Sequence, residues 1–307
     1  CLSTIVFLKM QKIFMADLCW GIDMGGTKIE GVVLESKPNF NIISRLRVPT
    51  EQAGGYDHVL DQFKILVDML REQTGKKPVR IGVGTPGIID TDTQLIKNSN
   101  TQCIIGKPMK KDLEKLLGIE VRMANDANCF AMAETHLGVV PDYVINPESV
   151  FGVIMGTGVG GGIVVHGKVL NGKHGISGEW GHNCLDESGE LCYCGRRGCV
   201  ETFLAGPWTE KYFHKISGEQ KSMKDIYRLY QAGDEFAIQT IDRLIHYFGK
   251  AVAVIINIID PDIIVFGGGL GNLDVLYERG KPEVKKHLFN NDLKTIFAKP
   301  KLGDSAG

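Results

Sequence analysis

The segment Cys19-Trp-Gly-Ile-Asp-Met-Gly-Gly-Thr-Lys28 is a short apolar strand that runs into a glycine turn. Residues 31–34 predict a second strand, which leaves this turn. The same order returns later, where a strand over residues 150–155 enters a glycine turn over residues 156–162 and a strand over residues 163–165 leaves it. This repeated opening, followed each time by helices, predicts an α/β fold with two related lobes.

The rest of the chain predicts elements that complete both lobes. Apolar spacing predicts helices over residues 56–73, 110–117, 127–137 and 234–258, a helix opened by a capping box at Ser222, and a strand over residues 262–266. We expect residues 1–15 to be an extension outside the fold. Residues 16–123 are expected to form a small α/β lobe and residues 124–307 a large one, with a cleft between them.

The charge balance excludes some classes of partner. The chain has 307 residues, with 35 basic and 36 acidic side chains and a formal net charge of −1. Such a chain has no overall field that would attract nucleic acid or an anionic membrane. The apolar residues 2–8 are too few to span a membrane, and the lysines that follow them reverse the order of a signal peptide. We therefore expect a cytoplasmic protein that binds neither nucleic acid nor a membrane.

The first glycine turn is suited to binding phosphate. Gly25 and Gly26 let backbone N–H groups approach a phosphate closely, and Thr27 adds a hydroxyl donor before the turn ends at Lys28. Asp23 precedes the turn, where its carboxylate is placed to hold Mg²⁺ directly or through water. An ordinary glycine hairpin is the alternative for this segment alone.

The second glycine turn has a formal dinucleotide-binding pattern over residues 156–161. A strand and not a helix follows it, so the Rossmann interpretation fails. A near match to the Walker motif ends at Gly167-Lys168, but Val169 stands where a serine or threonine must hold Mg²⁺. The sequence thus predicts two phosphate-binding hairpins, one in each lobe, and a third turn at Gly267-Gly-Gly269 that could lie against a nucleoside.

Asp126 lies between a predicted strand and a predicted helix. At a helix N-terminus the helix dipole keeps a carboxylate ionised. The commoner role of such a residue is to cap the helix. Between two phosphate sites, however, an ionised aspartate can accept the proton of a hydroxyl group and orient its oxygen toward a γ-phosphate.

Three cysteines fall within eight residues, at Cys192, Cys194 and Cys199, and His182 lies ten residues before the first of them. Three thiols and one imidazole predict a closed tetrahedral zinc site of the structural kind. A redox pair or unliganded thiols are the alternatives, and Cys184 could replace His182 as a ligand.

A metal in this loop would also hold two carboxylates close together. Glu179 lies shortly before His182, and Glu201 follows Cys199. Carboxylates held in this way would be good acceptors for sugar hydroxyl groups. Exposed surface glutamates are the alternative for each.

Five segments of the chain match a known pattern. They are Asp23-Met-Gly-Gly-Thr-Lys28, Asn125-Asp-Ala-Asn128, Gly156-Thr-Gly-Val-Gly-Gly161, Gly178-Glu-Trp-Gly-His182 and Cys192-Tyr-Cys-Gly-Arg-Arg-Gly-Cys-Val-Glu201. Together they resemble the ROK family of bacterial sugar kinases, from about Trp20 to the last residue. The resemblance implies the two-lobed, ribonuclease H-like fold of actin-like ATPases and hexokinase, with an interlobe cleft. It also implies a final helix in the family beyond residue 307, which we expect this chain to lack.

The resemblance implies a role for each matched residue. Asp126 is implied as the catalytic base. Nucleotide contacts are implied for Asp23, Gly25, Gly26, Thr27, Lys28, Gly156, Thr157, Gly158, Gly160, Gly161, Gly267, Gly268 and Gly269. Sugar contacts are implied for Gly87, Asn100, Asn125, Asp126, Glu179, His182 and Glu201. Structural zinc is implied at His182, Cys192, Cys194 and Cys199, so that His182 serves both metal and sugar.

Within the family, Gly178-Glu-Trp-Gly-His-Asn183 and Val200-Glu-Thr-Phe-Leu-Ala-Gly206 look most like the manno(fructo)kinase branch. This implies an ATP- and Mg²⁺-dependent, homodimeric kinase that makes fructose 6-phosphate, with mannose as a second candidate substrate. The N-acetylglucosamine kinase branch, which shares the segment that starts at Asn125, and glucokinase are the alternatives.

Two other classes of protein are alternatives. The family also contains sugar-responsive repressors, which carry an additional helix-turn-helix domain. The residues before Cys19 are too few for such a domain, and the aspartate of the kinases is present at Asp126. An actin-like filament protein agrees poorly with a zinc cluster. We therefore expect an enzyme.

Overall fold

The computed structural model describes residues 18–36, 40–290 and 292–303. The chain divides into two compact units, of which the first ends at Asp126 and the second begins at Ala127. The expected extension over residues 1–15 lies outside the described residues. Among the residues described, no helix is both long and apolar enough to cross a membrane.

The first unit contains a five-stranded sheet in the order β3-β2-β1-β4-β7. Its strands are β1 (Leu18–Met24), β2 (Lys28–Glu35), β3 (Ile42–Pro49), β4 (Arg80–Thr85) and β7 (Glu120–Asn125), and a separate small sheet pairs β5 (Ile88–Ile89) with β6 (Ile96–Lys97). Strands β1 to β3 form an antiparallel meander, whereas β4 pairs parallel to β1 and β7 parallel to β4.

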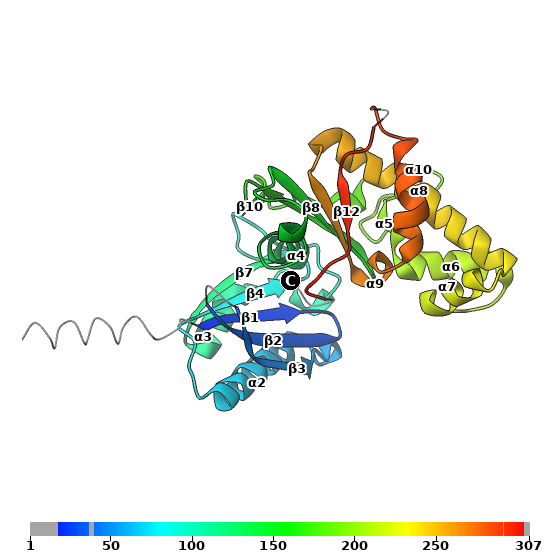
Figure 1. The fold of residues 1–307 in the computed structure, drawn as a ribbon. Coiled ribbons are helices and arrows are strands. Elements are labelled where there is room, and N and C mark those ends of the chain that lie inside the picture. Colours follow the sequence, from blue (N-terminus) through cyan, green and yellow to red (C-terminus); the bar gives the residue numbers. More distant parts are fainter. Residues whose placement is uncertain (1–17, 37–39, 291, 304–307) are drawn as a thin grey trace, which may run out of the picture. The chain divides into compact units, whose positions relative to one another are not determined.

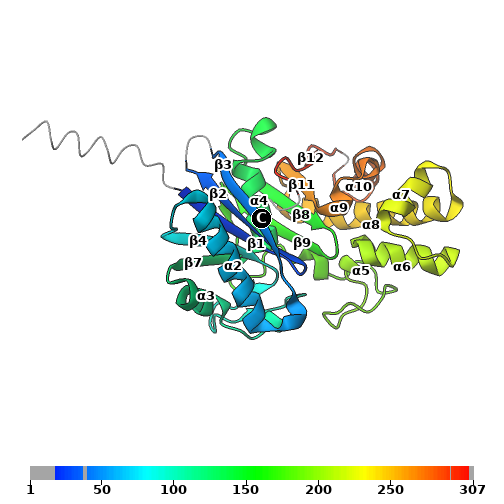
Figure 2. The same cartoon turned by 90° about the horizontal axis from the view of Figure 1, so that it is seen from below.

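Helix α2 (Tyr56–Thr74) lies along one face of this sheet (Figure 1), with α3 (Met109–Leu117) beside it (Figure 2). The buried side of α2 is apolar, and both helices end at a glycine with positive φ, Gly75 and Gly118. Gly31 of β2 allows the close approach of α2, because a Cβ atom there would lie 2.7 Å from Leu70. Short 3₁₀ turns occur at Gln52–Gly54 and Gln102–Ile104.

The second unit repeats this topology, with a sheet in the order β10-β9-β8-β11-β12. Its strands are β8 (Ser149–Met155), β9 (Val159–Val165), β10 (Lys168–Val169), β11 (Ile263–Gly267) and β12 (Ile296–Ala298). The first three in sequence are antiparallel, and β11 pairs parallel to β8 and β12 parallel to β11. The duplication expected from the two glycine turns is therefore present in the strand order, and the expected α/β class is confirmed.

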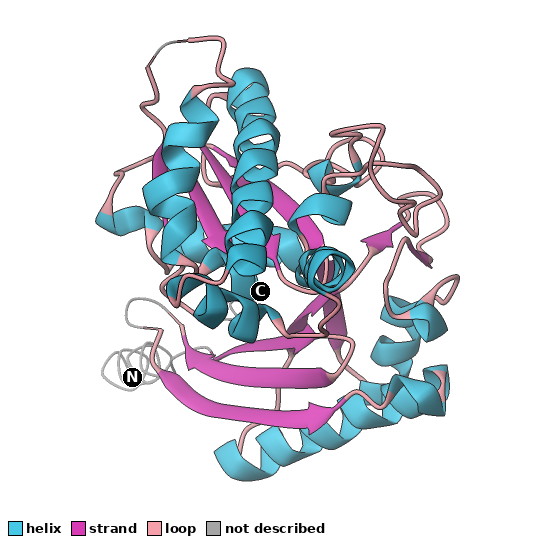
Figure 3. Ribbon diagram, turned by 90° about the vertical axis from the view of Figure 1, so that its right-hand side faces the viewer, coloured by secondary structure: helices cyan, strands magenta, loops and turns pink. Residues whose placement is uncertain are grey.

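Helices pack against the strands of each unit (Figure 3). Those of the second unit are α4 (Asp126–His136, whose first residue belongs to the first unit), α5 (Glu201–Leu204), α6 (Gly206–Ser217), α7 (Met223–Gln231), α8 (Glu235–Ile259), α9 (Gly268–Gly271) and α10 (Lys281–Lys285). A π-helical turn at Leu276–Gly280 precedes α10, and 3₁₀ turns occur at Val140–Asp142 and Trp180–His182.

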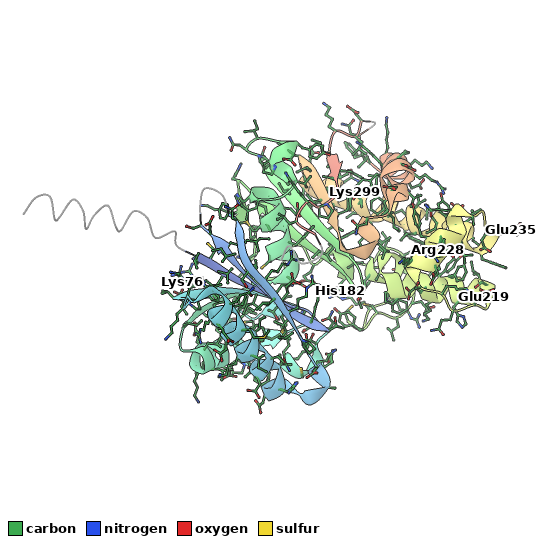
Figure 4. The ribbon with its side chains drawn as sticks, turned by 60° about the horizontal axis from the view of Figure 1, so that its bottom comes forward. Lys76, His182, Glu219, Arg228, Glu235 and Lys299 are labelled. Carbon is green, nitrogen blue, oxygen red and sulfur yellow. The ribbon has the colours of Figure 1, made fainter. Side chains whose placement is uncertain are left out.

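Capping side chains begin two of these helices. The Ser222 side chain accepts from the backbone N–H of Asp225 at the start of α7, as the capping box predicts, and Asp234 accepts from Ala237 at the start of α8. Helices α6, α7 and the beginning of α8 form the end of the unit at which Figure 4 labels Glu219, Arg228 and Glu235.

Candidate active site

Three parallel strands of the first unit end at one edge of its sheet. Asp23 near the end of β1 is aligned with Gly84 of β4, and Thr85 of β4 is aligned with Asn125 at the end of β7. The side-chain amide of Asn125 donates a hydrogen bond of 3.1 Å to the carbonyl oxygen of Gly87. Because parallel strands run in one direction, Asp23, the turn at Gly87 and the Asn125–Asp126 pair converge at this edge.

The first glycine turn is held by hydrogen bonds on both sides. The N–H of Gly25 donates to the carbonyl oxygen of Lys28 over 2.8 Å, and the Thr50 hydroxyl donates to the carbonyl oxygen of Gly25 over 2.7 Å. Thr27 is exposed. A Cβ atom on Gly26 would lie 3.8 Å from the hydroxyl oxygen of Thr101, so the turn lies near the segment that carries Asn100.

Asp23 and Asp126 repel each other electrostatically. Burial of the Asp23 carboxyl raises its pKa to about 6, and the charge of Asp126 contributes to this rise, while Lys28 opposes it. Two carboxylates that disfavour each other's charge form a suitable environment for a hard divalent cation, since Mg²⁺ prefers oxygen ligands. The chemistry of this pair therefore fits the Mg²⁺ expected from the sequence.

Two glycine turns of the second unit also lie side by side. Strand β8 pairs parallel to β11, with Ile154 opposite Gly267, so the turns that follow both strands share one edge of the sheet. Gly268 has φ +76°, and a Cβ atom there would lie 2.3 Å from the carbonyl oxygen of Met155. The sequence predicted a turn at Gly267–Gly269, whereas the structure places the start of the short helix α9 at Gly268.

The second glycine turn is shorter than expected. It closes with a 2.9 Å hydrogen bond from the N–H of Gly156 to the carbonyl oxygen of Gly158, and Thr157 between them is exposed. Strand β9 already begins at Val159, so Gly160 and Gly161 belong to a strand. Gly161 lies under the indole of Trp180, because a Cβ atom would come within 2.6 Å of that ring.

Two side chains that sequence reasoning did not connect with this hairpin bind it directly. The buried carboxylate of Glu201 accepts a hydrogen bond of 3.0 Å from the N–H of Val159, and a Cβ atom on Gly158 would lie 2.7 Å from that carboxylate. The indole N–H of Trp180 donates to the carbonyl oxygen of Gly160 over 3.0 Å. Glu201 was expected only as a sugar ligand, and no pattern in the sequence indicates its bond to the hairpin.

The expected metal ligands lie together. The ligand atoms of His182, Cys192, Cys194 and Cys199 all lie within 4.8 Å of one another. The distance is 3.6 Å from the Cys192 Sγ to the His182 Nδ1 and also 3.6 Å between the Sγ atoms of Cys194 and Cys199. A tetrahedral zinc with ordinary bond lengths places such ligand atoms about 3.6–3.8 Å apart, so the four residues fit zinc.

Two neighbours contact this candidate metal cluster, and a further cysteine near it does not belong to it. The Nε2 of His182 lies 3.0 Å from the hydroxyl oxygen of Tyr193, a residue that the sequence analysis did not select. One carboxylate oxygen of Glu201 lies 3.9 Å from the Cys192 Sγ. Cys184 is exposed and lies outside the group of four ligands. Glu201 therefore contacts both the metal cluster and the second glycine hairpin.

Glu179 lies on the other segment that approaches this hairpin. It is half-buried, and its neighbour Gly178 has φ +91°. A Cβ atom on Gly178 would lie 2.4 Å from the carbonyl oxygen of Gly161, which requires glycine there. The segment that carries Glu179, Trp180 and His182 is thus packed directly onto β9.

Comparison with known proteins adds to this geometry. The ROK family model matches residues 19–307. An N-acetyl-D-glucosamine kinase of Mannheimia succiniciproducens is 35% identical over 301 residues, covering 94% of this chain and 96% of the relative. One of Histophilus somni is 34% identical over 299 residues, covering 94% and 95%. The crystal structure of a ROK hexokinase from Thermus thermophilus superposes with a TM-score of 0.81 at 31% identity, covering 94% of each chain.

Proposed function

This chain belongs to the ROK family and is an ATP-dependent sugar kinase, and from that premise we propose that it transfers the γ-phosphoryl group of ATP to the 6-hydroxyl of N-acetyl-D-glucosamine. Relatives with that activity in their names align with nearly the whole chain. The relatives described above do not support the preference for fructose that we expected from the sequence. They support N-acetylglucosamine, which the sequence analysis gave as an alternative.

The observation that carries the catalytic assignment is the convergence of Asp23 and Asn125–Asp126 at one edge of the first sheet. In the proposed reaction Asp126 accepts the proton of the sugar hydroxyl as its oxygen attacks the γ-phosphorus. The Asn125 amide, held by Gly87, orients the neighbouring backbone. Phosphoryl transfer depends mainly on positioning and charge neutralisation, so a carboxylate is a sufficient base.

The glycine turns would bind the nucleotide. In the first unit, phosphate oxygens could accept hydrogen bonds from backbone N–H groups and from the exposed hydroxyl of Thr27. In the second unit, backbone N–H groups and the exposed hydroxyl of Thr157 offer the same donors. The segment from Gly267 to Gly269, beside the second hairpin, would contact the nucleoside. Lys28 would add positive charge at the first turn.

Two metal ions belong to this proposal. Asp23 would hold Mg²⁺, which neutralises phosphate charge when bound. His182 and the three cysteines would hold zinc, which fixes the loop that carries the sugar ligands His182, Glu179 and Glu201. Asn100, exposed beside the first turn, is a further candidate sugar ligand, as are Gly87 and Asn125. The homodimer expected from the sequence stays a prediction.

A coupled ADP-release assay with N-acetylglucosamine, glucose, mannose and fructose tests the proposal. We expect kcat/KM to be highest for N-acetylglucosamine, by about tenfold or more, since a site that binds a polar substituent rejects sugars without it. An Asp126→Asn variant serves as the inactive control. A higher kcat/KM for fructose would restore the first expectation, and no ADP release with any of the four sugars would contradict both substrate assignments.

A further inference from the structure

Helices α8 and α10 approach each other closely at one point. A Cβ atom on Gly249 of α8 would lie 2.5 Å from the Cγ of Glu283, and one on Gly280, just before α10, would lie 2.8 Å from the ring of Phe248. Val284 beside Glu283 is fully buried. Glycines on both sides of the contact and a buried valine thus define the spacing of the two helices at Glu283.

A cluster of three possible metal ligands lies at this contact. His246 comes from α8, Glu283 from α10, and His287 from the turn that follows α10. The same Glu283 oxygen, Oε1, lies 3.4 Å from the Nδ1 of His246 and 3.4 Å from the Nε2 of His287. All three ligand atoms lie within 4.8 Å of one another. The side chains of His246 and His287 are 51% and 30% exposed, so ions in solution can reach them.

We propose that His246, Glu283 and His287 bind a divalent first-row transition-metal ion. Around a metal with bonds of about 2.1 Å, tetrahedral ligand atoms lie about 3.4 Å apart, which equals both nitrogen–oxygen separations in the cluster. The two nitrogens lie within 4.8 Å of each other, and the exposed ring of His246 can rotate to adjust their separation.

The ligand types select the metal. Two imidazoles and one carboxylate suit Zn²⁺, Ni²⁺ or Cu²⁺, whereas Mg²⁺ and Ca²⁺ prefer sites built from oxygen. Lys286 forms an ion pair with Oε2 of Glu283 and leaves Oε1 to the histidines. Its positive charge opposes a bound cation, so this site is weaker than one without the lysine.

This site is separate from the machinery of the proposed function. None of its three residues belongs to the cysteine cluster or to the glycine turns. A bound ion would join α8 to α10 and so stabilise the segment that follows Gly267–Gly269. Binding to the folded protein alone would raise its unfolding temperature.

Calorimetric titration of the tag-free protein with Ni²⁺, after metal analysis has shown that the cysteine cluster keeps its metal, tests the proposal. We expect about one further equivalent to bind and the unfolding temperature to rise. His246→Ala and His287→Ala should each weaken this binding about tenfold or more and remove the rise. His214→Ala, which alters an exposed histidine on α6, should change neither result.

Lys286→Gln provides a second, opposite test, because it removes the competing charge and retains all three ligands. We expect it to strengthen Ni²⁺ binding several-fold. The proposal is wrong if the wild-type protein takes up no further equivalent, or if both histidine variants bind Ni²⁺ as the wild type does. Neither outcome depends on kinase activity, so the proposed function could stand while this site fails, and the reverse.

Discussion

Turnover is expected to depend on Asp126 more than on any other single residue. Asp126→Asn keeps the size of the side chain and removes its basicity, so we expect kcat to fall by about 10²-fold or more while sugar affinity changes little. Steady-state kinetics and calorimetric sugar binding measure the two effects separately. Asp61→Asn, at an exposed position on α2, is the matched control and should retain full activity. Wild-type turnover in Asp126→Asn would remove this residue as the base.

The partly buried carboxylate of Asp23 makes the metal-free protein less stable at neutral pH. Its pKa is about 6 in the folded protein and 3.8 in the unfolded chain, so ionisation is harder after folding. This carboxyl therefore does not lower the free energy of unfolding below pH 3.8. The free energy of unfolding falls as the pH rises toward 6, and above pH 6 it stays lower by about 2–3 kcal/mol.

Asp23→Asn removes this titration. We therefore expect the metal-free variant to be more stable than the wild type at pH 8 and equally stable near pH 4, and to be inactive. Urea unfolding at the two pH values, with Asp61→Asn as the control, measures the difference. An equal stability gain at both pH values would show that Asp23 does not act through its charge.

Glu201 makes two contacts, and we expect its loss to change both the KM for ATP and the KM for sugar. Its carboxylate holds the Val159 N–H of the second glycine hairpin and also faces the metal cluster. We expect Glu201→Ala to raise the KM for ATP as well as for sugar, by about tenfold, since a hydrogen bond to a charged group is lost. Glu201→Gln retains an acceptor oxygen and should raise the KM for ATP less. A change confined to the sugar KM would assign Glu201 to the sugar alone.

At the scale of elements, the end of α4 is held by one buried carboxylate. Glu134 is fully buried and accepts hydrogen bonds from the N–H groups of Val139, Lys301 and Leu302, at 2.8, 3.1 and 2.9 Å. We expect Glu134→Ala to lower the free energy of unfolding by roughly 3 kcal/mol, because the buried N–H of Val139 and two partly buried N–H groups, those of Lys301 and Leu302, lose their acceptor. Denaturant unfolding checks this, with exposed Glu72→Ala of α2 as the control. A loss no larger than that of Glu72→Ala would contradict it.

The elements with a clear apolar period could be predicted from the sequence. The helix expected over residues 56–73 ends one residue before α2 does, and the helix expected over residues 234–258 begins and ends one residue before α8. Strand β3 was missed because its first residues depart from the usual pattern: Ile42 and Ile43 are exposed, whereas Ser44 is buried and bonds to Gln73 of α2. A strand is predicted from apolar residues at the buried positions, and in β3 a serine occupies one of these positions.

The candidate site divides in the same way. The glycine turns, Asp126 and the candidate metal ligands could be selected from the sequence because the chemistry proposed for them requires particular residue types at short spacings. Trp180 and Tyr193 were missed as contacts because one bonds to the backbone of β9 and the other to a ring nitrogen of His182. Such bonds depend on how segments pack, which no local spacing encodes.

At the scale of the whole molecule, the two units share one strand order, and the candidate metal ligands lie in a loop that connects several parts of the second. Glu201 reaches from the cluster to the second hairpin. In the same loop, Asp186 accepts a 3.3 Å hydrogen bond from the Tyr247 hydroxyl of α8, and Arg243 of α8 lies against the rings of Phe203 and Tyr247. Disturbing the cluster should therefore affect ligand binding before it unfolds a core that is built from other residues.

Removal of the metal tests this order of events. With a strong chelator, or in Cys192→Ser, we expect sugar affinity to fall about tenfold or more, because the loop holds the proposed sugar ligands. The unfolding temperature should fall only slightly, because the core of α8, β8 and β11 is apolar and does not depend on the metal. Calorimetric sugar binding, far-UV circular dichroism and metal analysis follow the three quantities in one sample. Cys184→Ser changes an exposed thiol outside the ligand group and should keep metal, affinity and stability. If metal loss and global unfolding coincide, the cluster supports the whole unit; if affinity survives metal loss, the loop keeps its sugar ligands in place without zinc.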